Sequence, residues 1–149
     1  MTTALFSGII QENITYRWKG SKLESEFFQN NIGLGVDIES VSRFADMIGK
    51  FKRDTLRRVY TENELAYCFS KRNPAPSLAA RFAFKEAAFK ALSPLGQRIY
   101  YRQVEINNSP SGAPMGRFIS DELNLKFLLK VSLSHSRQHA IAFVIALKK

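Results

Sequence analysis

The sequence predicts a single small α+β domain in which a small antiparallel sheet packs against a long buried helix. Three observations carry this prediction. A glycine-containing apolar stretch at 33–38 is typical of a strand, an apolar helix is expected up to residue 92, and two apolar runs at 130–134 and 140–147 are typical of paired strands. With 149 residues, 45% of them hydrophobic, the chain is long enough to bury one core.

The first two elements are expected between residues 33 and 58. "GLGVDI" predicts a strand that ends at Asp37. Residues 38–58 then follow with helical spacing, because Val41, Phe44 and Ile48 fall on one face.

Two further helices are predicted from their terminal signals. "TENE" at 61–64 is a capping box, which opens a short helix through Cys68. "NPAPS" then breaks the chain, and Ser77 is a plausible N-cap for a helix that runs to Leu92 and stops at Pro94.

The last third of the chain is expected to be mainly strand. Residues 103–107 resemble a strand, "NNSPSGAP" is rich in turn formers, and a short helix is expected around 119–126. The final runs, 130–134 and 140–147, are joined by a turn at 135–139.

The net charge of +9 lies entirely in residues 31–149, which hold 19 basic against 10 acidic side chains. Such an excess favours an anionic partner, which could be a nucleic acid, a phosphorylated small molecule or an acidic protein. A lone Cys68 excludes an internal disulfide and a cysteine-based zinc cluster, and the reducing cytoplasm is the expected location. The apolar stretches are too short to span a bilayer. With two histidines and one cysteine, a metal site would depend on carboxylates and would suit a hard cation.

Residues 1–30 form an N-terminal extension of unknown role, followed by a single domain at 31–149. The extension lacks the pattern of a secretory signal, and its acidic residues argue against an organelle transit peptide. We expect it to be ordered and docked on the domain.

Glu86 and Lys90 stand out in "RFAFKEAAFKAL", a helix that is apolar nearly all the way round. They could form an ordinary ion pair one turn apart. Alternatively, a carboxylate in these surroundings needs another cation. Asp37, at the end of its strand, could be a helix N-cap, or it could join Glu86 in holding Mg²⁺ that bridges phosphates.

Two other polar patterns have both a structural and a functional interpretation. In "SLSHS", strand alternation separates His135 from Ser134 as a catalytic base, although a hydroxyl-rich strand end would suit phosphate oxygens. Arg43, Lys50 and Arg57 form a stripe on one helix face with Met47 inside it, which favours a protein-docking surface over a merely solvated face.

Three stretches in order, "GVDIESVSRF", "RFAFKEAAFKAL" and "VSLSHSRQHAIAFVIA", resemble the holo-acyl-carrier-protein synthase family of the 4′-phosphopantetheinyl transferase superfamily. "VYTENELAYC" and "NPAPSLAARF" between them are also similar to that family, and the resemblance covers roughly residues 33–149. It implies a phosphopantetheinyl-transferase-like fold. It also implies Mg²⁺-dependent transfer of 4′-phosphopantetheine from coenzyme A to a serine of apo acyl carrier protein, which releases adenosine 3′,5′-bisphosphate and supports fatty acid biosynthesis.

The resemblance also implies roles for individual residues. Asp37 and Glu86 would bind Mg²⁺ and, with Lys90, would be catalytic. The coenzyme A site would comprise Arg81, Lys85, Lys90, Ser134 and His135. The carrier-docking residues would be Arg43, Met47, Lys50, Arg53 and Arg57. The general base would be Glu86 or a water held by the metal.

A homotrimer with sites at subunit boundaries is also implied, and neither nucleic acid nor membrane is expected as a partner. Ser93, Pro94 and Leu95 depart from the glycine-flanked turn of the family, so the approach to the pantetheine arm is left open. An RNA-binding module would explain the charge, but the aromatic residues sit mostly at core-like positions. A homologue without activity is disfavoured, because Asp37, Glu86 and Lys90 are all present.

Overall fold

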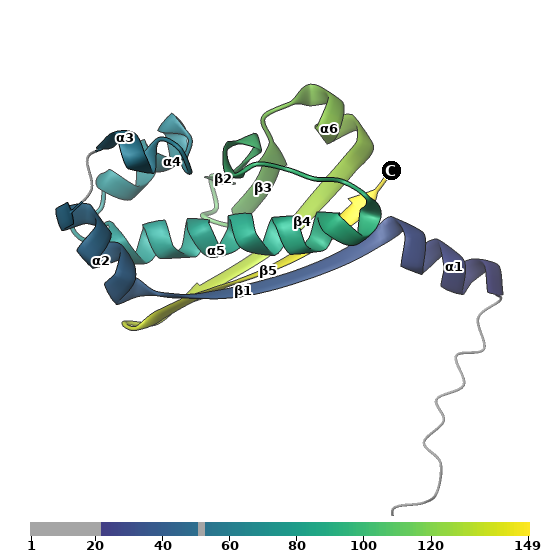
Figure 1. Cartoon of the computed structure of the whole chain (residues 1–149), viewed down its shortest axis with the longest axis horizontal. Helices are drawn as coiled ribbons and strands as arrows, with labels where there is room; N and C mark the ends of the chain where they lie inside the picture. Colours follow the sequence, from purple (N-terminus) through teal and green to yellow (C-terminus); the bar gives the residue numbers. More distant parts are fainter. Residues whose placement is uncertain (1–21, 51–52) are drawn as a thin grey trace, which may run out of the picture.

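The computed structural model describes residues 22–50 and 53–149 (Figure 1). The helices of this part of the chain are α1 (Lys22–Asn31), α2 (Val41–Lys50), α3 (Arg53–Leu56), α4 (Glu62–Phe69), α5 (Ala75–Leu92) and α6 (Asp121–Lys126), with short 3₁₀ turns η1 (Ser93–Leu95) and η2 (Tyr101–Gln103). The strands are β1 (Ile32–Ser40), β2 (Val104–Asn108), β3 (Pro114–Phe118), β4 (Phe127–His135) and β5 (His139–Lys148). The predicted α+β class is confirmed.

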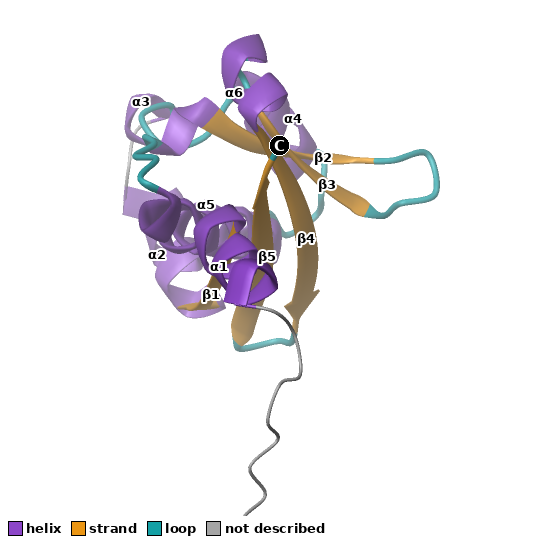
Figure 2. Ribbon diagram, turned by 90° about the vertical axis from the view of Figure 1, so that its right-hand side faces the viewer, coloured by secondary structure: helices purple, strands orange, loops and turns teal. Residues whose placement is uncertain are grey.

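The strands form two antiparallel sheets. The larger has the order β1-β5-β4, so the last strand lies at its centre, and the smaller pairs β2 with β3. Helix α5 runs along one face of the larger sheet, and α2 lies near its N-terminal end (Figure 1). The β2–β3 hairpin projects from the body of the molecule (Figure 2).

Helix α5 and strand β1 are in backbone contact. A Cβ atom on Gly33 would lie 1.8 Å from the carbonyl oxygen of Ala91, and one on Gly35 would lie 1.9 Å from that of Ala87. Only glycine permits the strand backbone to approach the helix this closely. The alanines on the facing side of α5 also have small side chains, so they do not hold the two backbones apart. The glycines of "GLGVDI" therefore set the distance between the strand and the helix.

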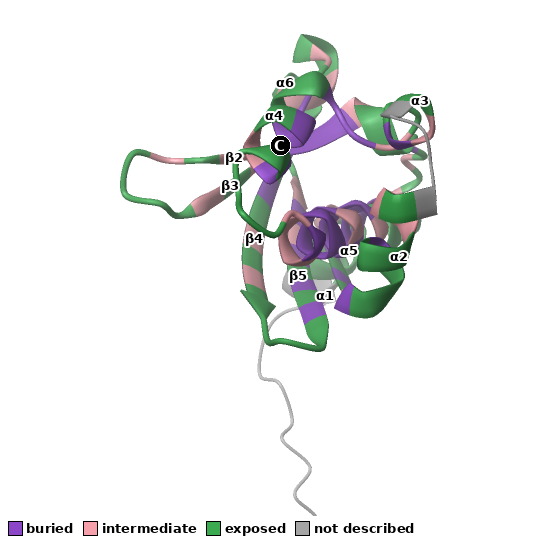
Figure 3. Cartoon of the chain, turned by 90° about the vertical axis from the view of Figure 1, so that its left-hand side faces the viewer, coloured by how far each residue is buried: buried purple, intermediate pink, exposed green. Residues whose placement is uncertain are grey.

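The core surrounds α5. Its buried residues include Ala83, Phe84 and Leu92, which pack with Val104 of β2 and Val144 of β5. A second buried cluster joins α2, α4 and the start of α5 through Phe44, Tyr60 and Leu78. Figure 3 shows α5 as the most continuously buried helix, with exposed residues on α2 and α6 around it. Among the described residues, none of the helices is both long enough and apolar enough to cross a membrane.

The N-terminal elements correct two predicted boundaries. Strand β1 does not end at Asp37 but continues to Ser40, because residues up to Ser40 keep their register with β5 as far as His139. The helix predicted at 38–58 therefore begins at Val41, whose backbone N–H bonds to the carbonyl of Gln138. It is also divided into α2 and α3, and residues 51–52 between them lie outside the described residues.

The remaining predictions were partly right. The capping box at Thr61 and Glu64 is confirmed. Ser77 is not the N-cap of α5, which begins two residues earlier with Pro74 at the cap, and Pro94 lies inside η1 after the helix. Strand β3 was not predicted, because a proline and a glycine interrupt its five residues. The expected docking of residues 1–21 lies outside the described residues.

Candidate active site

The close approach of β1 and α5 brings Asp37 next to Lys90. Asp37 lies on the same side of β1 as Gly33 and Gly35, the side that faces α5. The Lys90 ammonium donates to Asp37 Oδ1 at 2.9 Å and to the carbonyl oxygen of Val36 at 3.0 Å. Because the helix begins only at Val41, the N-cap interpretation of Asp37 is wrong.

Glu86 lies one turn before Lys90 on α5, but its hydrogen-bond partner is Tyr101. The phenol of Tyr101 donates to Glu86 Oε1 at 2.5 Å. This hydrogen bond, with burial and the negative charge of Glu86, raises the pKa of Tyr101 to about 12, so the phenol keeps its proton. Lys90 thus turns to Asp37 rather than to Glu86.

The surrounding charges show that Asp37 and Glu86 share one neighbourhood. The hydrogen bond to Asp37, with the charges of Asp37, Glu86 and Glu39, raises the pKa of Lys90. Burial raises the pKa of Glu39; the charges of Asp37 and Glu86 add to this, although Arg43 opposes it from 2.7 Å. Asp37, Glu86 and Glu39 therefore lie near enough to one another to act on the same charged groups.

The donor set fits a magnesium ion. Asp37 Oδ2 is buried and meets no hydrogen-bond partner within the described part of the chain, which marks an oxygen available to a cation. In the same part of the chain, no group of three or more histidine, cysteine, aspartate or glutamate side chains is arranged to hold a metal. Two carboxylates with water and phosphate oxygens are a usual ligand set for Mg²⁺, and Asp37 and Glu86 could supply the two.

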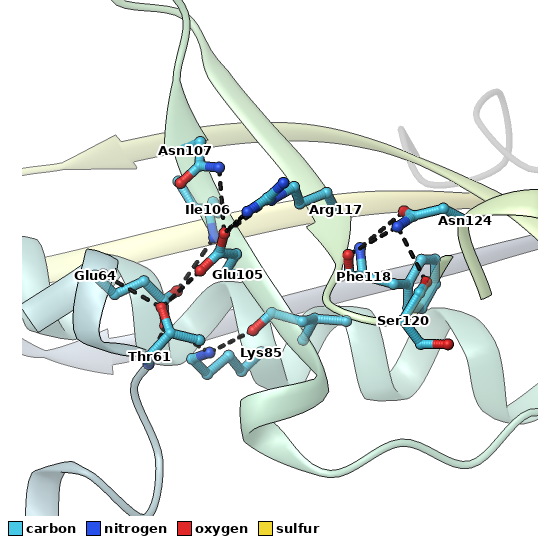
Figure 4. Close-up of polar contacts among 11 residues, drawn as sticks. Thr61, Glu64, Lys85, Glu105, Ile106, Asn107, Arg117, Phe118, Ser120 and Asn124 are labelled. Carbon is cyan, nitrogen blue, oxygen red and sulfur yellow. Dashed lines mark hydrogen bonds and ion pairs between the residues drawn. The ribbon is translucent and has the colours of Figure 1, made fainter. Parts of the chain in front are cut away.

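Lys85, predicted to bind coenzyme A, lies in a buried polar network (Figure 4). Its side chain is fully buried, and its ammonium contacts Glu64 Oε2 at 2.8 Å and the carbonyls of Tyr101 and Val104 at 2.8 and 2.6 Å. Burial lowers the pKa of Lys85, against the charge of Glu64. These three contacts use all three ammonium protons, so in this conformation Lys85 offers none to a phosphate.

The network continues through β2 and β3. Glu64 Oε1 accepts from the backbone N–H of Ile106. Glu105 accepts from Thr61, Asn107 and Arg117, with the shortest contact 2.6 Å from Arg117 Nη2 (Figure 4). The sequence identified Glu64 only as a capping residue, and it signalled nothing for Tyr101, whose contact with Glu86 depends on the turn η2.

Arg81 and His135 line a cavity of about 220 Å³. The Arg81 guanidinium lies 4.0 Å from the ring centroid of Tyr67 and donates to Asn108 at 3.1 Å. The structure does not bring Ser134 to this cavity, because strand alternation places it on the opposite face of β4 from His135.

A larger cavity, of about 360 Å³, lies beside Glu86. Its walls are mainly aromatic and apolar, with Phe89, Ile99, Tyr100 and Tyr101 beside the carboxylate, and Arg58 and Lys85 complete the lining. Such a cavity suits an uncharged chain that carries a few polar groups.

The predicted basic stripe is not continuous. Arg43 is exposed on α2, whereas Met47 is half-buried against the second core cluster. Arg57 lies beyond the end of α3, so it does not share a helix with Arg43, and it pairs with Asp54 at 3.4 Å and Glu62 at 3.1 Å. The side chains of Lys50 and Arg53 lie outside the described residues.

The comparison with protein families assigns this fold to a class of transferases. The model of the 4′-phosphopantetheinyl transferase superfamily matches residues 33–144. The chain belongs to this superfamily, in its holo-acyl-carrier-protein synthase family, and is a transferase.

Individual relatives are similar over most of their length. The holo-[acyl-carrier-protein] synthase of Halothermothrix orenii is 38% identical over 76% of this chain and 94% of the relative, and that of Thermodesulfovibrio yellowstonii is 39% identical over 76% and 96%. The crystal structure of the Helicobacter pylori enzyme in complex with coenzyme A has a TM-score of 0.64 and 29% identity, over 78% of this chain and 99% of that one. The Bacillus anthracis enzyme, in complex with CoA (3′,5′-ADP), has a TM-score of 0.65 and 26% identity, over 78% and 96%.

Proposed function

We propose that this protein transfers 4′-phosphopantetheine from coenzyme A to a serine of apo acyl carrier protein, with Mg²⁺ held by Asp37 and Glu86, and thereby supports fatty acid biosynthesis. One observation carries the metal-dependent part of the proposal. A buried carboxylate oxygen, Asp37 Oδ2, meets no partner within the described chain, close to a second carboxylate and to the Lys90 ammonium. The two carboxylates could hold a Mg²⁺ ion that binds a pyrophosphate, and the Lys90 ammonium could contact the same phosphate oxygens.

The reaction is a displacement at phosphorus. The serine hydroxyl oxygen of the carrier bonds to the phosphorus next to the pantetheine, and the bond from that phosphorus to the bridging oxygen breaks. Adenosine 3′,5′-bisphosphate leaves with the electron pair, and the hydroxyl proton passes to Glu86 or to water. Mg²⁺, when bound, supplies the positive charge that neutralises the pyrophosphate.

The chain's own residues would position these groups and offset their charge. Lys90, held by Asp37 and half-exposed, can also reach a phosphate oxygen as a point charge. Since the nucleophile belongs to the carrier, the enzyme needs no activated serine or cysteine of its own.

Coenzyme A would use the two cavities at its two ends. The aromatic cavity beside Glu86 suits the pantetheine arm, which is long, uncharged and partly apolar. The cavity lined by Arg81 and His135 suits the phosphates of the nucleotide. On a helix, residues five apart point roughly 140° away from each other, so Arg81 and Glu86 face different sides of α5 and one chain alone does not join the two cavities.

In a homotrimer with sites at subunit boundaries, the two cavities that one coenzyme A molecule needs could come from neighbouring subunits. The face of the large sheet that points away from α5 is apolar and exposed, with Leu34, Val36, Ile38, Ile141 and Phe143 each between 41% and 62% exposed. We call these five residues the outer face. A second copy of the chain on the outer face would cover it and would bring its own residues to the edge of β1.

Carrier protein would dock on α2, where Arg43 is exposed next to the metal-binding end of β1. Carriers of this kind are acidic, so the positive charge of Arg43 and of its neighbours would attract them.

The decisive experiment mixes the protein with coenzyme A, Mg²⁺ and apo acyl carrier protein and measures the intact mass of the carrier. We expect a gain of one phosphopantetheine, lost on chelation of the metal and abolished by Asp37→Ala or Glu86→Gln, both with a preserved fold. No mass gain with the wild-type protein would refute the proposed transfer. Full activity of either variant at low Mg²⁺ would refute the metal assignment.

A further inference from the structure

Tyr101 lines the cavity proposed for the pantetheine arm, and its phenol also contacts Glu86, one of the two proposed metal ligands. It lies at the start of η2, 15 residues from Glu86, and its phenol donates to Glu86 Oε1 at 2.5 Å. A carboxylate has two equivalent oxygens and free rotation about its last bond. A donor fixed on one oxygen therefore decides where the other oxygen points.

Tyr101 is itself held from two sides. Its backbone carbonyl accepts from the fully buried ammonium of Lys85 at 2.8 Å, and Lys85 is anchored by Glu64 on α4. Its ring packs against Phe82, with ring centroids 5.5 Å apart. Phe82 lies one turn before Glu86 on α5, so the ring and the carboxylate are fixed to the same helix.

We infer that Tyr101 is a positioning residue, which holds Glu86 Oε1 so that Oε2 is directed at the cation shared with Asp37. Lys85 and Glu64 act behind it, because they fix the backbone of the turn that carries the phenol. This inference rests on the proposed function, in which Glu86 is a metal ligand. It gives the buried Lys85–Glu64 pair a part in the site that does not require Lys85 to touch coenzyme A.

The test is the affinity of the site for Mn²⁺, which replaces Mg²⁺ and is measured by electron paramagnetic resonance of the free ion in the presence of coenzyme A. Loss of a group that orients a metal ligand typically weakens metal binding by about 10-fold to 100-fold. We expect Tyr101→Phe to weaken Mn²⁺ binding by about 10-fold. The control is Ser120→Ala, which removes a side-chain hydroxyl that forms no capping hydrogen bond at the start of α6, and it should leave Mn²⁺ affinity unchanged.

Kinetics separate positioning from a merely structural role. If Tyr101 positions Glu86, the transfer rate of Tyr101→Phe is low at limiting Mg²⁺ and recovers at high Mg²⁺, with an unchanged melting temperature. Unchanged or tighter Mn²⁺ binding in Tyr101→Phe, while the wild type is active and metal-dependent, would overturn the inference alone. A wild-type protein that shows no metal-dependent transfer would instead overturn the proposed function.

Discussion

Glu105 is a buried carboxylate whose ionisation should make the fold sensitive to acid. Its side chain is 1% exposed. Burial acts to raise its pKa, but hydrogen bonds from Thr61 and Arg117 outweigh burial and hold the pKa below its usual value. The unfolded chain therefore takes up this proton more readily than the folded one, and the stabilisation is present above the unfolded pKa and lost as the pH falls through the folded pKa.

We predict that Glu105→Gln lowers the free energy of unfolding by about 2 kcal/mol near pH 7, because charge-assisted hydrogen bonds are lost. The difference from wild type should shrink as the pH falls below about 4. Urea unfolding over a pH series measures both. The control is Glu122→Gln, whose partner Lys126 forms an exposed pair, and it should change little at any pH. A difference that stays constant into acid would show that Glu105 is not the acid-sensitive group.

Single residues were predictable where their chemistry depends on short spacing. Glu86 and Lys90 lie one turn apart, and Asp37 ends an apolar run, so each could be singled out from its local surroundings. Tyr101 and Glu64 could not, because their contacts join elements that are far apart in the chain. The family resemblance implies Ser134 and Lys85 as coenzyme A ligands. Ser134 lies on the opposite face of β4 from His135, and Lys85 lies in the buried network.

At the scale of elements, the contact of β1 with α5 leaves no room for a side chain on the strand glycines. A Cβ on Gly35 would meet backbone atoms at 1.9, 2.8 and 2.9 Å, none of which can move without shifting the helix. We predict that Gly35→Ala destabilises the protein by more than about 3 kcal/mol, the upper end of the usual overpacking cost. Thermal unfolding tests this.

Gly49→Ala is the matched control, because its Cβ would meet nothing within 4 Å and it lies on α2. It should leave stability unchanged or raise it by about 0.5 kcal/mol. Equal effects of the two substitutions would mean that the strand and the helix are not in backbone contact.

Helix α2 is the element on which the docking proposal depends. We predict that Arg43→Glu raises the KM for carrier protein by about ten-fold, chiefly through slower association, with little change in the KM for coenzyme A. The effect should weaken at high salt, which screens the charges over about 8 Å. Steady-state kinetics with each substrate at low and high salt measure this.

Lys126→Glu on α6 makes the same change of charge on another helix and should leave the KM for carrier nearly unchanged. If Arg43→Glu instead weakens coenzyme A and spares the carrier, α2 belongs to the nucleotide site.

Most elements could be predicted from local patterns, and the exceptions have physical causes. The capping box predicts the start of α4 correctly. Strand β1 extends beyond its predicted end, because its pairing with β5 and not its local propensity decides where it stops. Strand β3 contains Pro114 and Gly116, both weak strand formers, and it is held by pairing with β2 and by the ring of Phe84, which leaves no room for a Cβ at Gly116.

At the scale of the whole molecule, the exposed outer face leads to a prediction about assembly. Light scattering should give three times the 16.9 kDa of one chain. Phe143→Glu on the central strand should give monomers with little transfer activity, because a carboxylate would be buried between subunits. Leu125→Glu on α6, where the side chain is 75% exposed, should stay trimeric. A monomeric wild-type protein with full activity would overturn the trimer.

The order of the strands also governs how the chain can fold. Strand β5 separates β1 from β4, and its register joins Ile32 to Leu147, nearly the full length of the described chain. Until β5 pairs with them, β1 and β4 remain unpaired edges, and the part of α5 that contacts β5 stays uncovered. Closure of the sheet is therefore a long-range step that waits for β5, and such steps are slow and expose surfaces that aggregate. The ten residues of β5 therefore decide when β1 and β4 become parts of one sheet.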